Sequence, residues 1–180
     1  MKLWLLDADV IIDLLSLDLF DRLARSYEVN VASTVIEEVK SYNKSGTKHR
    51  IDFREQYVEN GLVKECSAST DEIKTILDKI PTHSHETIDP GELESLAVLA
   101  REEDMTFCSC DAAAIRTLPI LDLSNKGISV ENLLRSSGLQ RTGLKDRHTE
   151  QYFKNNLAIG QETKIYLFKT KGRKIMSKVI

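Results

Sequence analysis

Hydrophobic positions along the first 140 residues switch between two spacings, one typical of buried strands and one typical of helices. Residues 2–6 are apolar after Lys2, which favours a short buried strand. From Asp9 to residue 24 the apolar positions recur at helical spacing, and Asp9 is placed to cap the first turn. Residues 29–33 and 34–42 repeat this change of period. The pattern therefore predicts two consecutive β–α units.

The rest of the body continues this alternation and is predicted to end at Gly138. Ser69 and Glu72 have the spacing of a capping box, and Asp89 before Pro90 marks another helix start. The predicted elements are a loop over 44–54 leading into a helix to residue 59, a strand over 62–66, a helix over 69–79, a loop over 80–91, a helix over 91–104, a strand over 106–110, a short helix over 112–117, a strand over 119–124 and a helix over 129–137. This alternation predicts an α/β fold with a mostly parallel sheet covered by helices on both faces.

Residues 139–180 are predicted as a basic C-terminal extension that follows a body domain of residues 1–138. A polar helix over 144–157, a strand over 164–169 and a flexible basic end over 169–178 are expected there. Residues 141–180 hold 10 Lys and Arg against 3 Asp and Glu, whereas residues 1–140 hold 15 against 25. The net charge of −3 thus combines an acidic body with a basic tail, which either binds a partner or docks on the body itself.

The overall composition is that of a soluble globular protein, with 41% hydrophobic and 29% charged residues. There is no uncharged apolar run of ~18 residues, and the acids near the start of the chain argue against a secretory signal. We therefore expect a cytoplasmic protein without a membrane segment. The three cysteines fit reduced thiols, and Cys108 and Cys110 are expected to pack rather than to bind zinc.

Four acidic residues follow predicted strands or begin predicted helices. Asp7 comes after the first strand, Asp111 after the strand over 106–110, and Glu92 at the start of the helix over 91–104. Glu38 lies one helical turn beyond the second strand. Because open parallel sheets form their ligand sites at the carboxyl ends of the strands, we expect these four side chains to surround one pocket.

Clustered carboxylates repel one another, so such a pocket is expected to hold cations. Oxygen ligands without His or Cys at metal spacing favour a hard ion, Mg²⁺ or Mn²⁺. Such an ion activates water and stabilises the extra negative charge of a phosphodiester in its transition state.

The four acidic segments resemble the PIN-domain nucleases, in the same order and across residues 1 to 137. The matching segments are LLDADVIIDLL, ASTVIEEV, DPGELESLAVLA and FCSCDAAAI. The resemblance implies a Rossmann-like three-layer α/β/α fold and metal-dependent hydrolysis of RNA, with a 5′-phosphate and a 3′-hydroxyl as products. It also implies a role as the toxin of a toxin–antitoxin pair, with an antitoxin-type protein partner.

Carried onto this chain, the resemblance gives each acidic residue a role. Asp7 and Asp111 would bind the principal metal directly, and Glu38 and Glu92 would bind it through water or hold a second ion. Asp9 and Ser109 would orient the ligands. The family more often has Asp where Glu92 stands, and Glu94 is near enough in sequence to take this role instead.

Two surface features suggest further partners. A basic patch is expected to contact the RNA backbone and consists of Lys44, Lys48, Arg50 and Arg54. The leucine-rich helix over 9–24 offers a face for a homodimer.

Two other functions compete with the nuclease. The DADVI segment fits a phosphatase of the haloacid-dehalogenase type, in which the first Asp is phosphorylated and the second protonates the leaving group. That family also needs a lysine and a late acidic pair, and Asp111 has no second carboxylate next to it. The other alternative is a catalytically silent PIN-like module whose basic tail grips RNA phosphates or an acidic partner.

Overall fold

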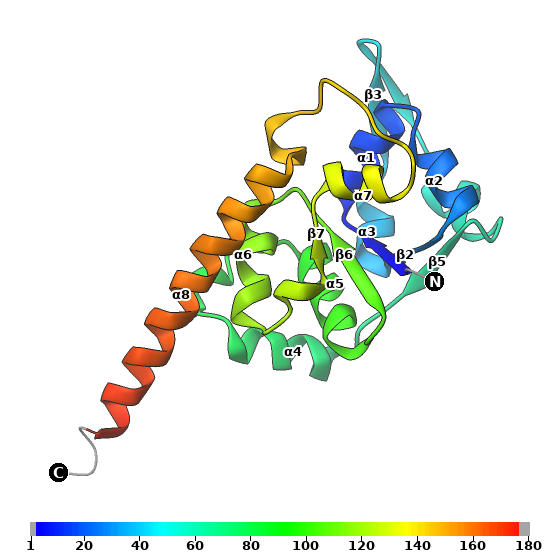
Figure 1. Ribbon diagram of the computed structural model, residues 1–180. Helices are drawn as coiled ribbons and strands as arrows, with labels where there is room; N and C mark the ends of the chain where they lie inside the picture. The colour runs from blue at the N-terminus through cyan, green and yellow to red at the C-terminus, as the bar shows by residue number, and fades with distance from the viewer. Residues whose placement is uncertain (1–2, 177–180) are drawn as a thin grey trace.

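The chain folds around one parallel sheet. The computed structural model describes the backbone of residues 3–176 and the side chains of residues 3–82 and 84–170. Within these residues the central sheet has five strands in the order β5-β2-β1-β6-β7, and every neighbouring pair is parallel. The strands are β1 (Leu3–Leu6), β2 (Glu28–Ala32), β5 (Val63–Cys66), β6 (Met105–Cys108) and β7 (Gly127–Ile128). Helices cover both faces (Figure 1), so the predicted three-layer α/β/α fold is confirmed.

Eight α-helices and an antiparallel hairpin complete the described part of the chain. The helices are α1 (Ala8–Ser16), α2 (Phe20–Ser26), α3 (Ser33–Glu38), α4 (Thr70–Lys79), α5 (Pro90–Arg101), α6 (Ala112–Ile120), α7 (Val130–Ser136) and α8 (Glu150–Met176). The hairpin consists of β3 (Ser41–Lys44) and β4 (Thr47–Arg50). Short turns of 3₁₀-helix span Thr82–Ser84, Ser124–Lys126 and Asp146–His148, and a π-helical turn spans Arg54–Val58.

The side chains of β1 show how the sheet separates two cores. Successive strand residues point to opposite faces, so Trp4 and Leu6 pack with α1, α2, α3 and α7, whereas Leu5 packs with α4, α5, α6 and α8. All three side chains are at most 1% exposed. A strand buried on both faces has no room for polar residues, which explains the continuous apolar run.

The register of the central strands brings the candidate acids to one edge. Leu6 at the end of β1 pairs with Cys108 at the end of β6, so Asp7 and Ser109 leave the sheet at the same level. On the other side of β1 lies β2, which is followed directly by α3. This helix ends at Glu38, the fourth candidate acid.

The predicted helix over 9–24 is in fact two helices. Asp18 adopts φ 58°, a left-handed conformation that a continuous helix does not allow, and α2 begins afresh at Phe20. The residue that caps α1 is Asp7, two residues before the predicted cap Asp9. Its side chain accepts a hydrogen bond from the Ala8 N–H at 2.8 Å.

The prediction of a helix over 34–42 followed by a loop was wrong beyond Glu38. Residues 41–50 form the β3–β4 hairpin, whose turn residues Ser45 and Gly46 have φ 50° and 80°. Positive φ at both central residues is the conformation of the tight turns that join two strands, and Ser-Gly provides it.

The predicted strands over 119–124 and 164–169 do not form strands. Residues 119–120 end α6, which contains Pro119, and the edge strand β7 comes later, at Gly127–Ile128. A short apolar run fits a buried helix as well as a strand, so periodicity alone could not separate them. Residues 164–169 belong to α8, where Ile165 and Phe168 are exposed, so this apolar run lies on the surface of a helix and not in a sheet.

The first half of α8 packs on the body. Phe153 is 4% exposed and joins the same core as Leu5, and Gly160 lies so close to α6 that a Cβ there would be 2.2 Å from the Arg116 carbonyl oxygen. The polar helix expected over 144–157 thus begins at Glu150 and continues as backbone through Met176. Lys2 of the predicted first strand and residues 177–178 of the predicted basic end lie outside the described residues.

No helix in the described range is both long and apolar enough to cross a lipid bilayer.

Candidate metal centre

A small cavity at the carboxyl ends of β1 and β6 is surrounded by acidic side chains. Its volume is about 120 Å³. Six of the seven lining residues carry a carboxyl group, and the lining consists of Asp7, Ala8, Asp9, Glu38, Asp89, Glu92 and Asp111. The structure thus brings together all four acids that the sequence suggested as ligands. No Lys or Arg is among the described residues that line this cavity.

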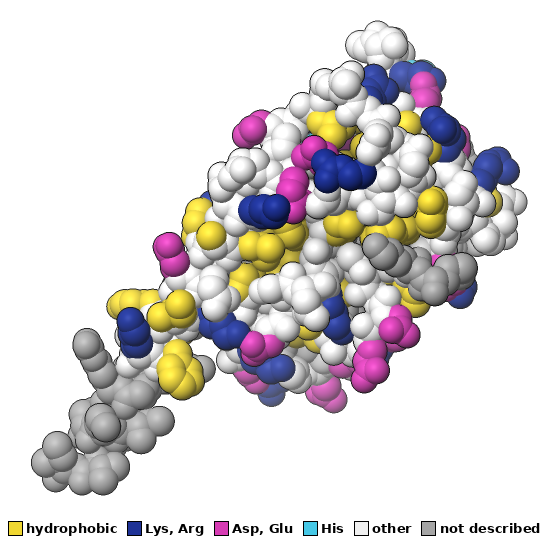
Figure 2. All heavy atoms as spheres, viewed as in Figure 1, with side chains coloured by type: hydrophobic (Ala, Val, Ile, Leu, Met, Phe, Trp, Pro, Cys, Tyr) yellow, Lys and Arg dark blue, Asp and Glu magenta, His cyan; other side chains and the backbone are white. Residues whose placement is uncertain are grey.

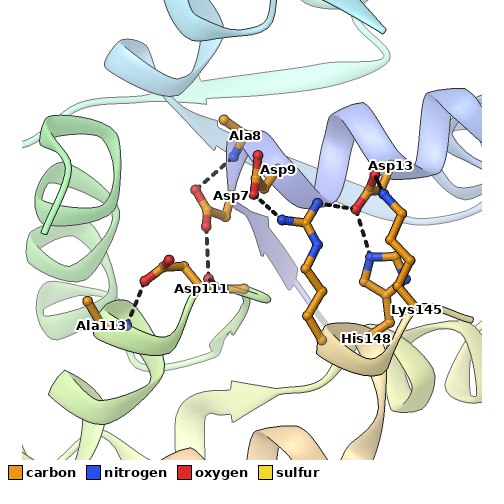
Figure 3. A network of polar contacts seen from close by, with 10 residues as sticks. Asp7, Ala8, Asp9, Asp13, Asp111, Ala113, Lys145 and His148 are labelled. Carbon is orange, nitrogen blue, oxygen red and sulfur yellow. Dashed lines mark hydrogen bonds and ion pairs between the residues drawn. The ribbon is translucent and has the colours of Figure 1, made fainter. Parts of the chain in front are cut away.

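Asp7 is the most enclosed aspartate of the cavity, at 4% exposed. Its Oδ1 accepts the Ala8 N–H at 2.8 Å, and its Oδ2 accepts the Ser109 hydroxyl at 2.8 Å (Figure 3). Burial nevertheless outweighs these bonds and raises the pKa of Asp7 to about 6. This carboxylate is therefore held in one orientation, and no basic side chain of the described residues pairs with its charge.

Ser109 connects the two aspartates. The same hydroxyl oxygen that donates to Asp7 accepts the Asp111 N–H at 3.0 Å. Asp111 caps α6 through Oδ1, which accepts the N–H groups of Ala113 at 2.6 Å and Ala114 at 3.2 Å. No hydrogen bond to the other oxygen, Oδ2, occurs within the described residues, so this atom is free to bind a ligand.

Glu92 enters the cavity from the first turn of α5. Its Oε2 accepts the Asp89 N–H at 3.1 Å, and its side chain is buried. Burial, followed by the charges of Asp7 and Asp111, raises its pKa to about 9. Without a bound cation Glu92 is therefore protonated at neutral pH.

Glu38 approaches from the opposite side, at the end of α3. Burial and then the charge of Asp89 raise its pKa, against the effect of a hydrogen bond from the Gly91 backbone. A Cβ at position 91 would lie 2.8 Å from Glu38 Oε2 and 2.9 Å from Val35 Cγ2. Glycine at this position allows α3 and α5 to approach each other at the cavity.

Glu94 has a different role from the one considered for it. Its two carboxylate oxygens accept backbone N–H groups, Oε2 from Thr34 at 2.7 Å and Oε1 from Ala68 at 3.2 Å. It does not line the cavity and instead ties α5 to the start of α3 and to the chain beyond β5. Of the two glutamates, Glu92 is the one in position to bind an ion there.

Asp89 is a cavity residue that the sequence reading treated only as a helix cap. It lines the cavity beside Glu92 and Glu38. The available signal was its place three residues before Glu92, at the same helix start.

Comparisons of the chain with protein-family models, with curated proteins and with solved structures found no match. The resemblance to PIN nucleases therefore rests on the acidic segments themselves.

A second polar cluster adjoins the cavity and is built around Asp13 of α1. Asp13 accepts hydrogen bonds from Lys145 at 2.6 Å, from Arg147 at 2.5 Å and from His148 Nε2 at 2.7 Å (Figure 3). Arg147 also donates to Asp9 at 2.5 Å, so one guanidinium connects this cluster to the cavity. The interactions fasten residues 145–148 to α1.

Asp13, Cys110 and His148 bring three ligand atoms within 4.8 Å of one another. However, Asp13 is already paired with two cationic side chains, which would repel a metal ion. Burial raises the pKa of the Cys110 thiol and keeps it protonated, which makes it a poor ligand. We therefore interpret this group as a structural cluster.

The predicted basic patch does not face the cavity. Lys44 pairs with Asp18 at the hairpin, and Arg54 pairs with Glu37 and Glu65. Lys48 and Arg50 are exposed on β4, and none of the four lines the acidic cavity. The leucines that were expected to form a dimer face are also engaged elsewhere, because Leu14, Leu15 and Leu23 are buried in the core of their own chain.

Proposed function

We propose that this protein is a divalent-metal-dependent ribonuclease of the PIN type. As the resemblance implies, it would act as the toxin of a toxin–antitoxin pair with an antitoxin-type protein partner. One observation carries the proposal: six carboxyl groups surround a cavity that contains no basic side chain of the described chain. Burying several carboxylates without a cation is costly, as the raised pKa values of Asp7 and Glu92 indicate.

The donor set fits Mg²⁺ or Mn²⁺. All the donors are carboxylate oxygens, the ligands that these hard ions prefer, and no thiol or imidazole of the described residues lines the cavity. Asp7, Asp111 and Glu92 would hold the ion, with Glu38 close by to bind it through water or to hold a second one. When bound, the ion supplies a Lewis acid that activates water and stabilises the negative charge developing on the phosphate.

The chain's own residues prepare this site. Ser109 fixes the direction of the Asp7 carboxylate and the backbone of Asp111 through one hydroxyl group. The hydrogen bond from Asp89 N–H holds Glu92 in the cavity. No side chain is needed as a nucleophile, because water attacks phosphorus and the carboxylates keep their ligand roles.

The phosphatase alternative is less well supported. It requires a lysine at the phosphoryl site, and none of the described residues lining the cavity is a lysine. Phosphorylation of Asp7 would also have to take place on an oxygen that already accepts a hydrogen bond, from Ala8 at Oδ1 or from Ser109 at Oδ2.

The decisive experiment compares wild type with Asp7→Asn on structured RNA in Mn²⁺. Wild type is expected to cleave, leaving 5′-phosphate ends, and the variant to be slower by at least about a hundredfold, since a direct metal ligand contributes several kcal/mol. Calorimetric titration with Mn²⁺ alone separates the alternatives: binding without cleavage would indicate a silent module. Equal cleavage by the two proteins would eliminate this cavity as the active site.

A further inference from the structure

A second groove opens directly beside the acidic cavity, between α6 and α8. Its volume is about 430 Å³, and it shares Asp111 with the acidic cavity. Arg116 and Ile120 line it from α6, and Ile159 and Thr163 line it from α8. An RNA strand that leaves the acidic cavity past Asp111 would therefore enter this groove.

Arg116 is positioned along this groove by a buried partner. Its Nε donates to Asn156 Oδ1 at 2.8 Å, and Asn156 is 4% exposed. The Arg116 side chain is itself exposed and forms no ion pair within the described residues. It is thus a fixed positive group available to a phosphate, whereas Lys164 nearby is paired with Asp122.

The groove continues as a stripe along the projecting part of α8. Ile159, Thr163 and Tyr166 are separated by four and three residues, so they lie on one side of the helix. Figure 1 shows α8 running past α6 and projecting beyond the body, and hydrophobic side chains are visible on this part in Figure 2. Tyr166 is 67% exposed and lies about 10 Å beyond Ile159 along the helix axis.

The chemistry of this surface fits single-stranded RNA better than a second copy of the chain. The groove is lined partly by hydroxyl groups and contains a fixed arginine. The apolar residues of the projecting helix do not form one face, because Phe168 lies about 200° around the axis from Tyr166. With Lys145, Arg147 and Lys164 paired to aspartates of the body, seven of the ten basic residues of 141–180 remain against three acidic ones, an excess that favours a polyanion.

We propose that the groove between α6 and α8 carries single-stranded RNA away from the acidic cavity, with Arg116 at a phosphate and Tyr166 stacked on a base. The inference rests on the proposed function, since it takes RNA as the substrate of the cavity. Exposed aromatic side chains beside basic groups bind single strands in this way, without reading sequence.

The test measures binding of a fluorescent single-stranded RNA to the full chain in EDTA, where metal-dependent cleavage does not occur. Tyr166→Ala is expected to weaken binding about tenfold, the loss produced by removing one stacked base. Tyr166→Phe should bind within about twofold of wild type, because the ring remains. Arg116→Gln should lower the slope of log affinity against log salt by about one.

Phe168→Ala is the matched control, because Phe168 is 82% exposed on the same helix but points away from the stripe. It should leave binding within about twofold of wild type. The inference fails if Tyr166→Ala binds like wild type or if both alanine variants lose affinity equally. It also fails if sedimentation shows a dimer that Tyr166→Ala dissociates, because a second copy would then occupy the stripe.

The two proposals can fail separately. If wild type binds RNA through Tyr166 but does not cleave it in Mn²⁺, RNA binding in the groove is supported and the nuclease activity is contradicted. If Mn²⁺-dependent cleavage depends on Asp7 while Tyr166→Ala binds RNA normally, the nuclease activity is supported and RNA binding in the groove is contradicted.

Discussion

Asp7 caps the N-terminus of α1, and Asp13 lies within the same helix. The two side chains are buried to a similar extent but have opposite electrostatic surroundings. Asp7 is 4% exposed and Asp13 is 5% exposed. Burial dominates at Asp7 and raises its pKa to about 6. Burial also acts to raise the pKa of Asp13, but hydrogen bonds from His148, Lys145 and Arg147 outweigh it and lower this pKa well below its usual range.

The difference shows how this chain distributes its cations. Two basic side chains and a histidine from residues 145–148 converge on one aspartate of α1. Within the described residues, the one ion pair of a basic side chain with the six carboxyl groups of the neighbouring cavity is that of Arg147 with Asp9. Asp13 thus fastens the C-terminal segment to the body, while the cavity keeps a negative charge that an external cation can neutralise.

The largest expected effect of a single substitution comes from removing the carboxylate of Asp13. Asp13→Asn should lower the free energy of unfolding by about 4 kcal/mol, because it leaves His148 and its cationic neighbours without a carboxylate. Chemical denaturation measures this change. Asp18→Asn is the control: Asp18 pairs with Lys44 at the surface, and its loss should cost less than about 1 kcal/mol. Similar costs for the two variants would remove the distinction between Asp13 and a surface aspartate.

The stability of the metal-free protein should depend on pH because the carboxyl groups of Asp7 and Glu92 have no cationic partner among the described residues of the cavity. The pKa values of Asp7 and Glu92 rise on folding from their ordinary values of 3.8 and 4.5 to about 6 and about 9, so the folded state binds more protons between these limits. Metal-free protein should therefore lose about 5 kcal/mol of stability between pH 5 and pH 8. Asp13 contributes nothing to this slope, because its lowered pKa places its titration below pH ~4.

Denaturation across this pH range, without and with Mg²⁺, measures the effect. Glu92→Gln should flatten the metal-free curve, because an amide does not ionise. A wild-type stability that rises from pH 5 to pH 8 in EDTA would contradict the sign of these shifts.

Adjacent glutamates at the end of α3 allow a matched test of the cavity. Glu38→Gln removes a cavity carboxylate and should slow Mn²⁺-dependent cleavage by about 50-fold, within the range seen when a metal site loses a supporting group. Glu37→Gln changes the next residue, which is exposed and pairs with Arg54, and should cleave at nearly the wild-type rate. Cleavage rates on one RNA substrate compare the two directly, and equal losses would mean that charge in general, not the cavity, controls activity.

The smallest expected effect concerns the hydroxyl that orients Asp7. Ser109→Ala removes the hydrogen bond to Asp7 Oδ2 and should weaken Mn²⁺ binding by about tenfold without abolishing it. Calorimetric titration measures the affinity. Ser109→Cys keeps a weaker donor, so its Mn²⁺ affinity should lie between those of wild type and Ser109→Ala. An unchanged Mn²⁺ affinity in Ser109→Ala would show that Ser109 does not support the metal site.

Local sequence patterns located four of the five central strands and most of the cavity. β1 is a short apolar run, and an acid placed just after a strand of a parallel sheet must emerge at its carboxyl edge. This rule brought Asp7 and Asp111 together before any coordinates, because both follow neighbouring strands in register. Glu92 was proposed because it begins a predicted helix, and this feature alone could not separate it from Glu94, two residues further along the same helix.

Tertiary structure alone decided what lies around those acids. The partners of Asp13 are more than 130 positions away in sequence, and no local spacing reveals such a contact. The path of α8 likewise depends on the close packing of Gly160 against α6, and residues 164–169, which were predicted as a strand, continue this helix. The sequence by itself determined where negative charge leaves the sheet, since that follows from strand periodicity. Only the folded chain decided which of those charges its own cations would reach, since that depends on contacts between distant segments.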